Sequence, residues 1–254
     1  MEKEKLIIGN LEVSYRTFKK EGNNKKMLII HGWGGSSDSW IKVGENLSKN
    51  GIDVIIPDYP GFGDTKIDKI YNIEDYALFI ESFAKELNLE NFILMGHSNG
   101  GRISIELENR GILKIKKLIL NNSAGIKRPL SKKQRIFGLI AKCFKIFKKI
   151  PGVNYLRNFF YRAIGGHDYL ALNNELIKAT FLNMIGSDSK EEIEKIKTET
   201  LLIWGENDTY TPLKDGKIMN NLIKKSKLII LDGEKHGIHL QNPDRLAKTI
   251  LENL

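Results

Sequence analysis

Six short apolar runs recur along the chain and alternate with longer amphipathic stretches. The runs are nearly continuous in Ile, Leu, Val and Met, which is typical of strands that are buried on both faces. They cover residues 27–30, 53–56, 91–95, 118–120, 201–204 and 227–231. Apolar positions at helical spacing cover roughly residues 37–49, 73–88, 99–109, 212–224 and 243–253. This alternation predicts a mostly parallel sheet with helices on both faces.

Two departures from this alternation refine the prediction. Residues 6–14 are typical of an antiparallel hairpin with a glycine-asparagine turn, which adds two edge strands and brings the sheet to eight. The sixth strand ends near Asn121 and the seventh begins near Thr200, so 78 residues separate them. An ordinary βαβ unit takes about 30 residues in all. We therefore predict a core of residues 1–121 and 200–254 that carries a helical cap of residues 122–199.

One serine stands in a turn that is typical of catalytic nucleophiles. Ser98 lies in the sequence Gly96-His97-Ser98-Asn99-Gly100, between the strand at 91–95 and the helix at 99–109. Such a turn raises the serine hydroxyl above the sheet edge, and its glycines avoid collisions in the crowded backbone. The same pattern also fits a glycine-rich turn that only packs a strand against a helix. The strand-turn-helix context favours Ser98 as a nucleophile.

A serine nucleophile needs a base to remove its proton and a carboxylate to orient that base. His236 and His239 follow the last strand, and Glu206 and Asp208 follow the strand before it. Catalytic groups in open α/β sheets gather at the carboxyl ends of the strands, so these candidates share one edge. We select His236, which is nearer the strand end, and Asp208; His239 and Glu206 are the alternatives. The order serine, aspartate, histidine along the chain agrees with this architecture.

An acyl-transfer site also needs N–H donors for the negative oxygen that develops during the reaction. The backbone N–H of Asn99, directly after the nucleophile, provides one donor. The loop after the strand at 27–30 reads His31-Gly32-Trp33-Gly34-Gly35, and its glycines allow the backbone to approach a substrate. We expect the backbone N–H of Trp33 to be the second donor. The remaining histidines are expected to have structural roles: His31, His97 and His167.

The chain resembles the α/β-hydrolase family in five stretches that occur in the family's order along nearly its whole length. They are His31-Gly32-Trp33-Gly34-Gly35, Pro57-Asp58-Tyr59-Pro60-Gly61-Phe62-Gly63, Gly96-His97-Ser98-Asn99-Gly100-Gly101, Trp204-Gly205-Glu206-Asn207-Asp208, and His236 with Pro243 seven residues on. The resemblance implies the α/β-hydrolase fold with a cap after the sixth strand. It also implies a triad of Ser98, Asp208 and His236, with no metal or organic cofactor.

The branches of this family differ in chemistry, and single residues separate them. Serine at position 98 argues against the haloalkane dehalogenase and epoxide hydrolase branches, which carry aspartate there. Carbon–carbon bond hydrolases of aromatic breakdown are similar at Pro60-Gly61-Phe62-Gly63, but they usually carry tryptophan where Gly237 stands. We therefore expect a serine hydrolase that cleaves a small-molecule carboxylic ester with an apolar or acyl-chain group. A carbon–carbon bond hydrolase, an acyltransferase and a non-catalytic ligand-binding protein are the alternatives.

The net charge of +9 is concentrated in one part of the chain. Residues 109–167 carry 15 Lys or Arg and no Asp or Glu, which leaves 25 basic and 31 acidic residues elsewhere. Residues 134–150 have an amphipathic helical pattern with a lysine-rich side. These lysines are either solvated on the cap or attract the cap to an anionic membrane surface. Co-sedimentation with anionic vesicles that depends on salt concentration tests the second hypothesis. Nucleic acid is not an expected partner, because no module that binds it is evident.

Cellular location is predicted from what the sequence lacks. A single cysteine, Cys143, cannot form an internal disulfide. No apolar run reaches the roughly 18 residues that a membrane span needs, and no signal peptide is evident at the N-terminus. We expect a cytoplasmic protein, and the sequence indicates no oligomeric state.

Overall fold

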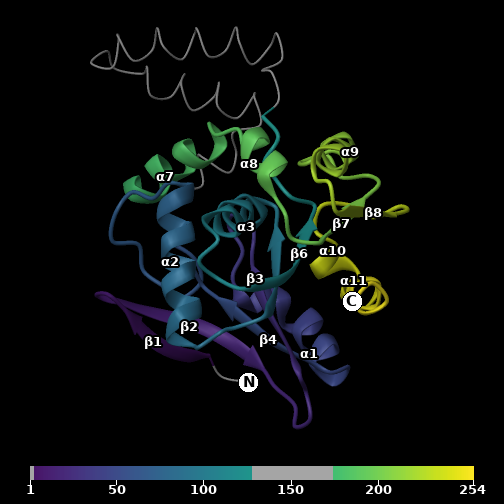
Figure 1. The fold of residues 1–254 in the computed structure, drawn as a ribbon. Coiled ribbons are helices and arrows are strands. Elements are labelled where there is room, and N and C mark those ends of the chain that lie inside the picture. The colour runs from purple at the N-terminus through teal and green to yellow at the C-terminus, as the bar shows by residue number, and fades with distance from the viewer. Residues whose placement is uncertain (1–2, 128–173) are drawn as a thin grey trace, which may run out of the picture.

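A computed structural model describes residues 3–127 and 174–254 of the chain. Its centre is an eight-stranded sheet with the strand order β1-β2-β4-β3-β5-β6-β7-β8 (Figure 1). Strands β3 to β8 run parallel to one another, whereas β2 is antiparallel to both β1 and β4. The strands are β1 (Glu4–Ile8), β2 (Leu11–Phe18), β3 (Lys25–Ile30), β4 (Ile52–Pro57), β5 (Phe92–His97), β6 (Ile115–Asn121), β7 (Thr200–Gly205) and β8 (Ser226–Leu231).

Helices cover both faces of this sheet (Figure 1). Side chains of α2, α3, α7, α8 and α9 join the apolar cluster that contains Leu28 and Leu94. Side chains of α1, α10 and α11 join a second cluster on the other face, which contains Ile29 and Met95. The helices are η1 (Ser37–Trp40), α1 (Ile41–Lys49), α2 (Ile73–Glu86), α3 (Asn99–Arg110), α7 (Glu175–Ile185), α8 (Lys190–Lys195), α9 (Leu213–Leu222), α10 (Ile238–Gln241) and α11 (Pro243–Leu251).

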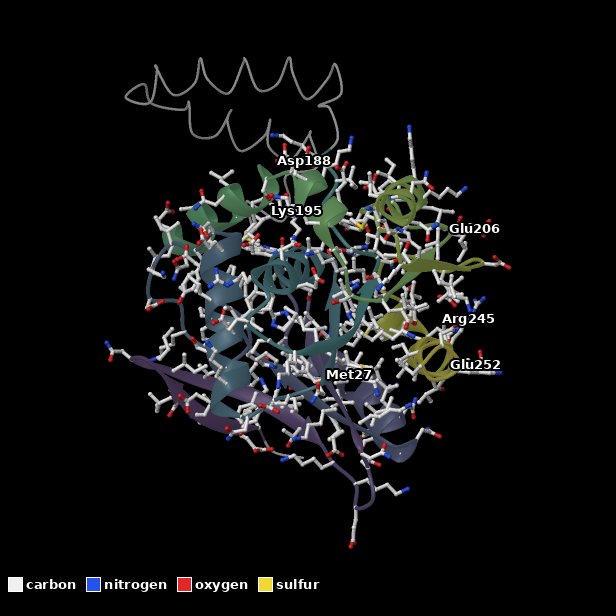
Figure 2. The ribbon with its side chains drawn as sticks, viewed as in Figure 1. Met27, Asp188, Lys195, Glu206, Arg245 and Glu252 are labelled. Carbon is white, nitrogen blue, oxygen red and sulfur yellow. The ribbon has the colours of Figure 1, made fainter. Side chains whose placement is uncertain are left out.

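The two apolar clusters explain why the central strands are nearly continuous in apolar residues. Successive side chains of a strand point to opposite faces of the sheet. In β3, Met27 packs in one cluster and Leu28 in the other, and both are fully buried. Figure 2 shows Met27 inside the fold, whereas the charged side chains of Glu206 and Glu252 lie at its margin. Neither face of these strands can therefore be polar.

The fold confirms the predicted mostly parallel eight-stranded sheet with helices on both faces. The edge hairpin is present as β1 and β2, with Gly9 in the left-handed region (φ 58°) at its turn. Each of the six apolar runs overlaps a strand, and the amphipathic stretches overlap η1 and α1, α2, α3, α9 and α11. The short helix α10 was not predicted.

The described part of the insertion after the sixth strand contains two helices. Helices α7 and α8 lie between β6 and β7, inside the predicted insertion at 122–199. The cationic amphipathic stretch at 134–150 lies outside the described residues. The division into a core and a cap domain stays a prediction. Within residues 3–127 and 174–254, none of the helices has the length and apolar character of a membrane span.

Candidate active site

Ser98 lies at a strained turn between β5 and α3. Its backbone angles are φ 52° and ψ −119°, in a region that residues other than glycine rarely adopt. Hydrogen bonds hold this conformation: the Ser98 N–H donates to the Asn121 carbonyl at 3.2 Å, and the Ser98 carbonyl accepts from the Ala124 N–H at 2.8 Å. Such a turn presents a serine side chain above the ends of the strands.

Glycines around Ser98 are required by close contacts with the neighbouring loop. A Cβ atom at Gly100 would lie 2.2 Å from the carbonyl oxygen of Ile30 and 2.4 Å from that of His31. A Cβ atom at Gly32 would lie 3.1 Å from the Ser98 Cβ atom. The loop after β3 and the start of α3 are therefore in direct backbone contact, which brings the loop that carries Trp33 beside Ser98.

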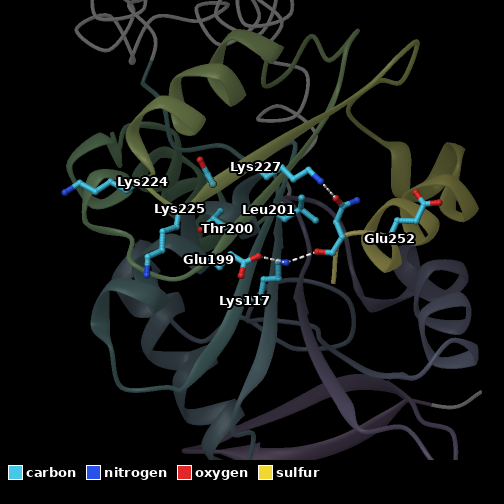
Figure 3. Close-up of a pocket in the computed structure, with 10 residues that line it drawn as sticks. Lys117, Glu199, Thr200, Leu201, Lys224, Lys225, Lys227 and Glu252 are labelled. Atoms are coloured by element: carbon cyan, nitrogen blue, oxygen red, sulfur yellow. Dashed lines mark hydrogen bonds and ion pairs between the residues drawn. The ribbon is translucent and has the colours of Figure 1, made fainter.

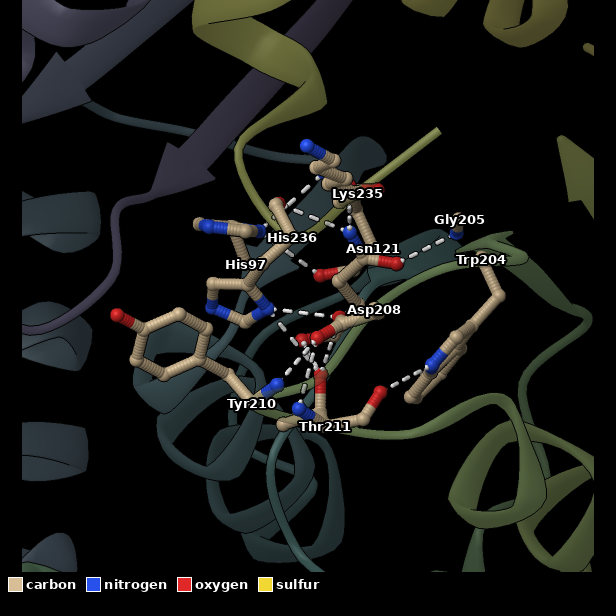
Figure 4. Close-up of polar contacts among 10 residues, drawn as sticks. His97, Asn121, Trp204, Gly205, Asp208, Tyr210, Thr211, Lys235 and His236 are labelled. Atoms are coloured by element: carbon tan, nitrogen blue, oxygen red, sulfur yellow. Dashed lines mark hydrogen bonds and ion pairs between the residues drawn. The ribbon is translucent and has the colours of Figure 1, made fainter. Parts of the chain in front are cut away.

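Asp208 and His236 form a hydrogen-bonded pair between two loops that follow β7 and β8. The His236 Nδ1 atom lies 2.7 Å from the Asp208 Oδ2 atom (Figure 4). Because a carboxylate can only accept, Nδ1 carries a proton, and in the neutral imidazole the Nε2 atom therefore keeps its lone pair. The other carboxylate oxygen, Oδ1, accepts from the backbone N–H groups of Tyr210 at 2.8 Å and Thr211 at 2.9 Å. These donors fix the carboxylate in the orientation that the imidazole needs.

Ser98 and His236 line the same cavity, which has a volume of about 770 Å³. Trp33 and Asn99 line it as well, and Asn99 begins α3, where backbone N–H groups have no partner within the helix. In the described part of the chain, no hydrogen bond joins the Ser98 hydroxyl to His236. Catalytic hydrogen bonds of this kind often form only when substrate binds. The cavity thus collects the predicted nucleophile, base and oxyanion donors, with Asp208 behind the base.

His239, the alternative base, is held in a structural setting. Its ring is 8% exposed and stacks on Trp40 with 4.5 Å between ring centroids. Its Nδ1 atom has no hydrogen-bond partner among the described residues, so no carboxylate orients it. Burial, and then the nearby His236 and His31, lower the pKa of His239 to about 4. His239 is therefore neutral near pH 7, and its ring packs beside the candidate catalytic groups.

Glu206, the alternative acid, binds the backbone of Gly233. Its side chain is exposed, and its Oε2 atom accepts from the backbone N–H of Gly233 at 3.0 Å. This contact ties together the loops after β7 and β8 at the surface. The carboxylate in contact with the candidate base is that of Asp208.

Two further histidines near the site are buried and hydrogen-bonded to the backbone, in agreement with their predicted structural roles. His31 donates from Nδ1 to the Gly32 carbonyl at 2.8 Å and stacks on Tyr59 at 4.2 Å. Burial lowers the pKa of His31 to about 4. His97 lies with Nδ1 3.0 Å from the Asn121 carbonyl, and burial followed by His239 and His236 holds its pKa well below the usual value. His167 lies outside the described residues.

Sequence reasoning missed two residues that contact the Asp208–His236 pair. The Thr211 hydroxyl lies 2.7 Å from the Asp208 Oδ2 atom, and Asn122 donates to the His236 carbonyl at 2.9 Å. Thr211 follows Asp208 by three residues, a spacing at which an aspartate commonly accepts from the backbone in a turn. That local signal could have found Thr211. No local signal connects Asn122 with a residue more than a hundred positions away.

Another hollow lies at the opposite, amino-terminal edge of β6, β7 and β8 (Figure 3). Its lining includes several lysines, and Lys117 forms an ion pair with Glu199 at 2.7 Å. It has no histidine in its lining. Nowhere in the described ranges do three or more His, Cys, Asp or Glu side chains form a group suited to a metal ion.

Known proteins are similar to this chain in sequence and in fold. A family model described as alpha/beta hydrolase fold matches residues 25–137. Monoacylglycerol lipase abhd6-A of Xenopus laevis is 24% identical over 275 residues, and the match covers 97% of this chain and 80% of the length of that lipase. The uncharacterized hydrolase YugF of Bacillus subtilis is 24% identical and covers 98% of this chain and 96% of its own. A solved membrane phospholipase A, described as a bacterial virulence factor, matches with a TM-score of 0.77 at 21% identity, covering 100% of this chain and 87% of its own.

These matches agree with the architecture described above. The strand order, the antiparallel edge strands and the strand-turn-helix at residues 92–110 are those that the resemblance implied. The family model and the solved structure both indicate this fold. The chain has the α/β-hydrolase fold.

Proposed function

We propose that this protein is a serine hydrolase that cleaves carboxylic esters. The observation that carries the proposal is the Asp208–His236 hydrogen bond of 2.7 Å at the wall of the cavity where Ser98 is raised on its turn. An imidazole with Nδ1–H fixed by a carboxylate has a free Nε2 lone pair, which is the state that a general base requires. The lipase and phospholipase names among the similar proteins support ester chemistry.

In the proposed reaction, His236 Nε2 takes the proton of the Ser98 hydroxyl as its oxygen attacks the ester carbonyl carbon. The carbonyl electrons move to the oxygen, which accepts from the backbone N–H groups of Trp33 and Asn99. The imidazolium, held by Asp208, then gives its proton to the leaving alkoxide as the ester bond breaks. Water, activated by the same imidazole, releases the acid from the acyl-enzyme and restores the Ser98 hydroxyl.

A fluorophosphonate probe tests the nucleophile directly. We expect the wild-type protein to be labelled on the peptide that contains Ser98, because the probe needs an activated serine hydroxyl. Ser98→Ala is expected to abolish labelling, whereas Ser104→Ala, a buried serine on α3 outside the cavity lining, keeps the fold as a control. Labelling is read by gel fluorescence and by mass spectrometry of the modified peptide. Labelling of Ser98→Ala at wild-type level, or none of the wild type, would contradict the proposal.

The lining of the cavity supports an apolar acyl or alkyl group as part of the substrate. Apolar side chains from five parts of the fold line it, namely Trp33, Ala124, Ile126, Phe181, Met184, Tyr210 and Leu240. Trp33 and Phe181 pack together with ring centroids 5.0 Å apart, and Met184 is buried behind them. Each methylene of a substrate that leaves water here contributes roughly 0.8 kcal/mol to binding. We infer a substrate whose acyl chain lies along these side chains.

Esters of increasing chain length test this inference. From p-nitrophenyl acetate to octanoate, kcat/KM is expected to rise by at least about tenfold, because the longer chain buries more apolar surface. Phe181→Ala is expected to reduce that rise, while activity toward the acetate changes little. A kcat/KM that stays constant or falls with chain length would remove the acyl-chain assignment. Product analysis with added alcohols or thiols distinguishes hydrolysis from acyl transfer.

A further inference from the structure

Asn122, at the carboxyl end of β6, connects the loops that carry Asp208 and His236. Its Nδ2 group donates to the backbone carbonyl of His236 at 2.9 Å and to that of Lys235 at 3.1 Å. Its Oδ1 atom accepts from the backbone N–H of Gly205 at 2.8 Å. One fully buried carboxamide therefore connects the end of β7 with the loop that carries His236.

The backbone of Asn122 binds the loop that carries Asp208. Its carbonyl accepts from the Thr211 hydroxyl at 2.9 Å, and that hydroxyl also lies 2.7 Å from the Asp208 Oδ2 atom. Its N–H donates to the Ile203 carbonyl in β7 at 2.9 Å. Every hydrogen-bonding group of Asn122 thus has a partner, and these partners flank the acid and the base of the proposed reaction.

The residue type and the conformation at this position fit the contacts. Asn122 has φ 44°, in the left-handed region, which asparagine adopts more readily than most residues. A carboxamide supplies donor hydrogens on one side and an acceptor on the other. Aspartate has the same shape but would place an oxygen against the carbonyls of Lys235 and His236, where only a donor is tolerated.

We propose that Asn122 is a positioning residue that holds the loop carrying His236 in place relative to Asp208. The proposal rests on the function proposed above and adds a residue that touches none of the reacting atoms. Loss of its carboxamide frees the backbone at residues 235 and 236, so the imidazole moves relative to both the carboxylate and the nucleophile. A misplacement of about 1 Å in such a site lowers the rate by about 10²-fold without changing substrate contacts.

The test compares Asn122→Asp and Asn122→Gly with the wild type. Glycine tolerates the positive φ and removes only the side chain, whereas aspartate keeps the shape and reverses the donor. We expect both variants to lower kcat for p-nitrophenyl octanoate by about 10- to 100-fold, with KM within about twofold. Ile119→Val, a buried change on β6, is the control for lost stability, and the kcat of this variant is expected to stay unchanged. Thermal melting confirms that each variant is folded.

A second readout does not depend on turnover. A low-field proton resonance of the His236 Nδ1–H group, identified by its absence in His236→Ala, reports the bond to Asp208. We expect this resonance to move to higher field or to broaden in both Asn122 variants and to stay unchanged in Ile119→Val. An unchanged resonance, or a kcat within twofold of wild type, would overturn the role of Asn122. If the wild type binds no fluorophosphonate, the proposed function fails separately, and the resonance still tests Asn122.

Discussion

His236→Ala is expected to lower kcat for ester hydrolysis by about 10⁶-fold, the size of loss seen when a triad histidine is removed. His236 is the histidine whose Nδ1 atom lies 2.7 Å from a carboxylate and which lines the cavity with Ser98. Without it, no group removes the serine proton or protonates the leaving alkoxide. Substrate contacts are largely kept, so KM is expected to change by less than about tenfold.

The neighbouring histidine provides the matched control for this prediction. His239 also lines the cavity, but its partner is the ring of Trp40 and its Nδ1 atom has no carboxylate. His239→Gln is expected to keep kcat within about tenfold of the wild type, because a residue that moves no proton contributes none of the acid-base acceleration. Steady-state kinetics of both variants on one ester decide the matter. A larger loss of kcat in His239→Gln than in His236→Ala would assign the role of base to His239 instead.

Asp208→Asn is expected to lower kcat by about 10⁴-fold with the fold intact. An amide in this place can donate to the His236 Nδ1 atom, which then loses its proton. The Nε2 atom is protonated instead and cannot act as a base toward Ser98. The backbone N–H groups of Tyr210 and Thr211 bind the amide oxygen as they bind Oδ1 now, so geometry is kept.

Glu206→Gln serves as the control for the acid. This exposed side chain accepts from Gly233 at the surface, so its kcat is expected to stay within about twofold of wild type. Single-turnover kinetics with the octanoate ester separate the acylation step from product release in both variants. Equal losses in Asp208→Asn and Glu206→Gln would show that the Asp208–His236 bond does not tune the base.

Much of the fold was predictable because its signals are local. Strands such as β5 and β7 are buried on both faces, so they read as unbroken apolar runs. The hairpin at the edge follows from a glycine turn between alternating strands. Helix α10 was missed because four residues are too few for a periodic pattern to be recognised.

The edge of the sheet at which the candidate site lies could be predicted, because the strand topology decides it. Ser98 directly follows β5, and Asp208 and His236 lie in the loops after β7 and β8. Parallel strands bring their carboxyl ends to one edge of the sheet. The choice between His236 and His239 was less secure, because both follow β8 within a few residues. Only loop geometry shows that His236 faces Asp208 while His239 turns onto Trp40.

The sequence by itself determined the elements, the order of the candidate triad and the glycines that the turn at Ser98 needs. These features depend on neighbours within one element or on the general rule for parallel sheets. The tertiary structure alone decided which imidazole receives the carboxylate and which residue joins the two loops. Asn122 meets Gly205 and His236 only because β6 and β7 are adjacent and the loop after β8 folds back over their ends. Hydrogen bonds between such distant segments leave no periodicity in the chain, so no pattern of residues could have shown them.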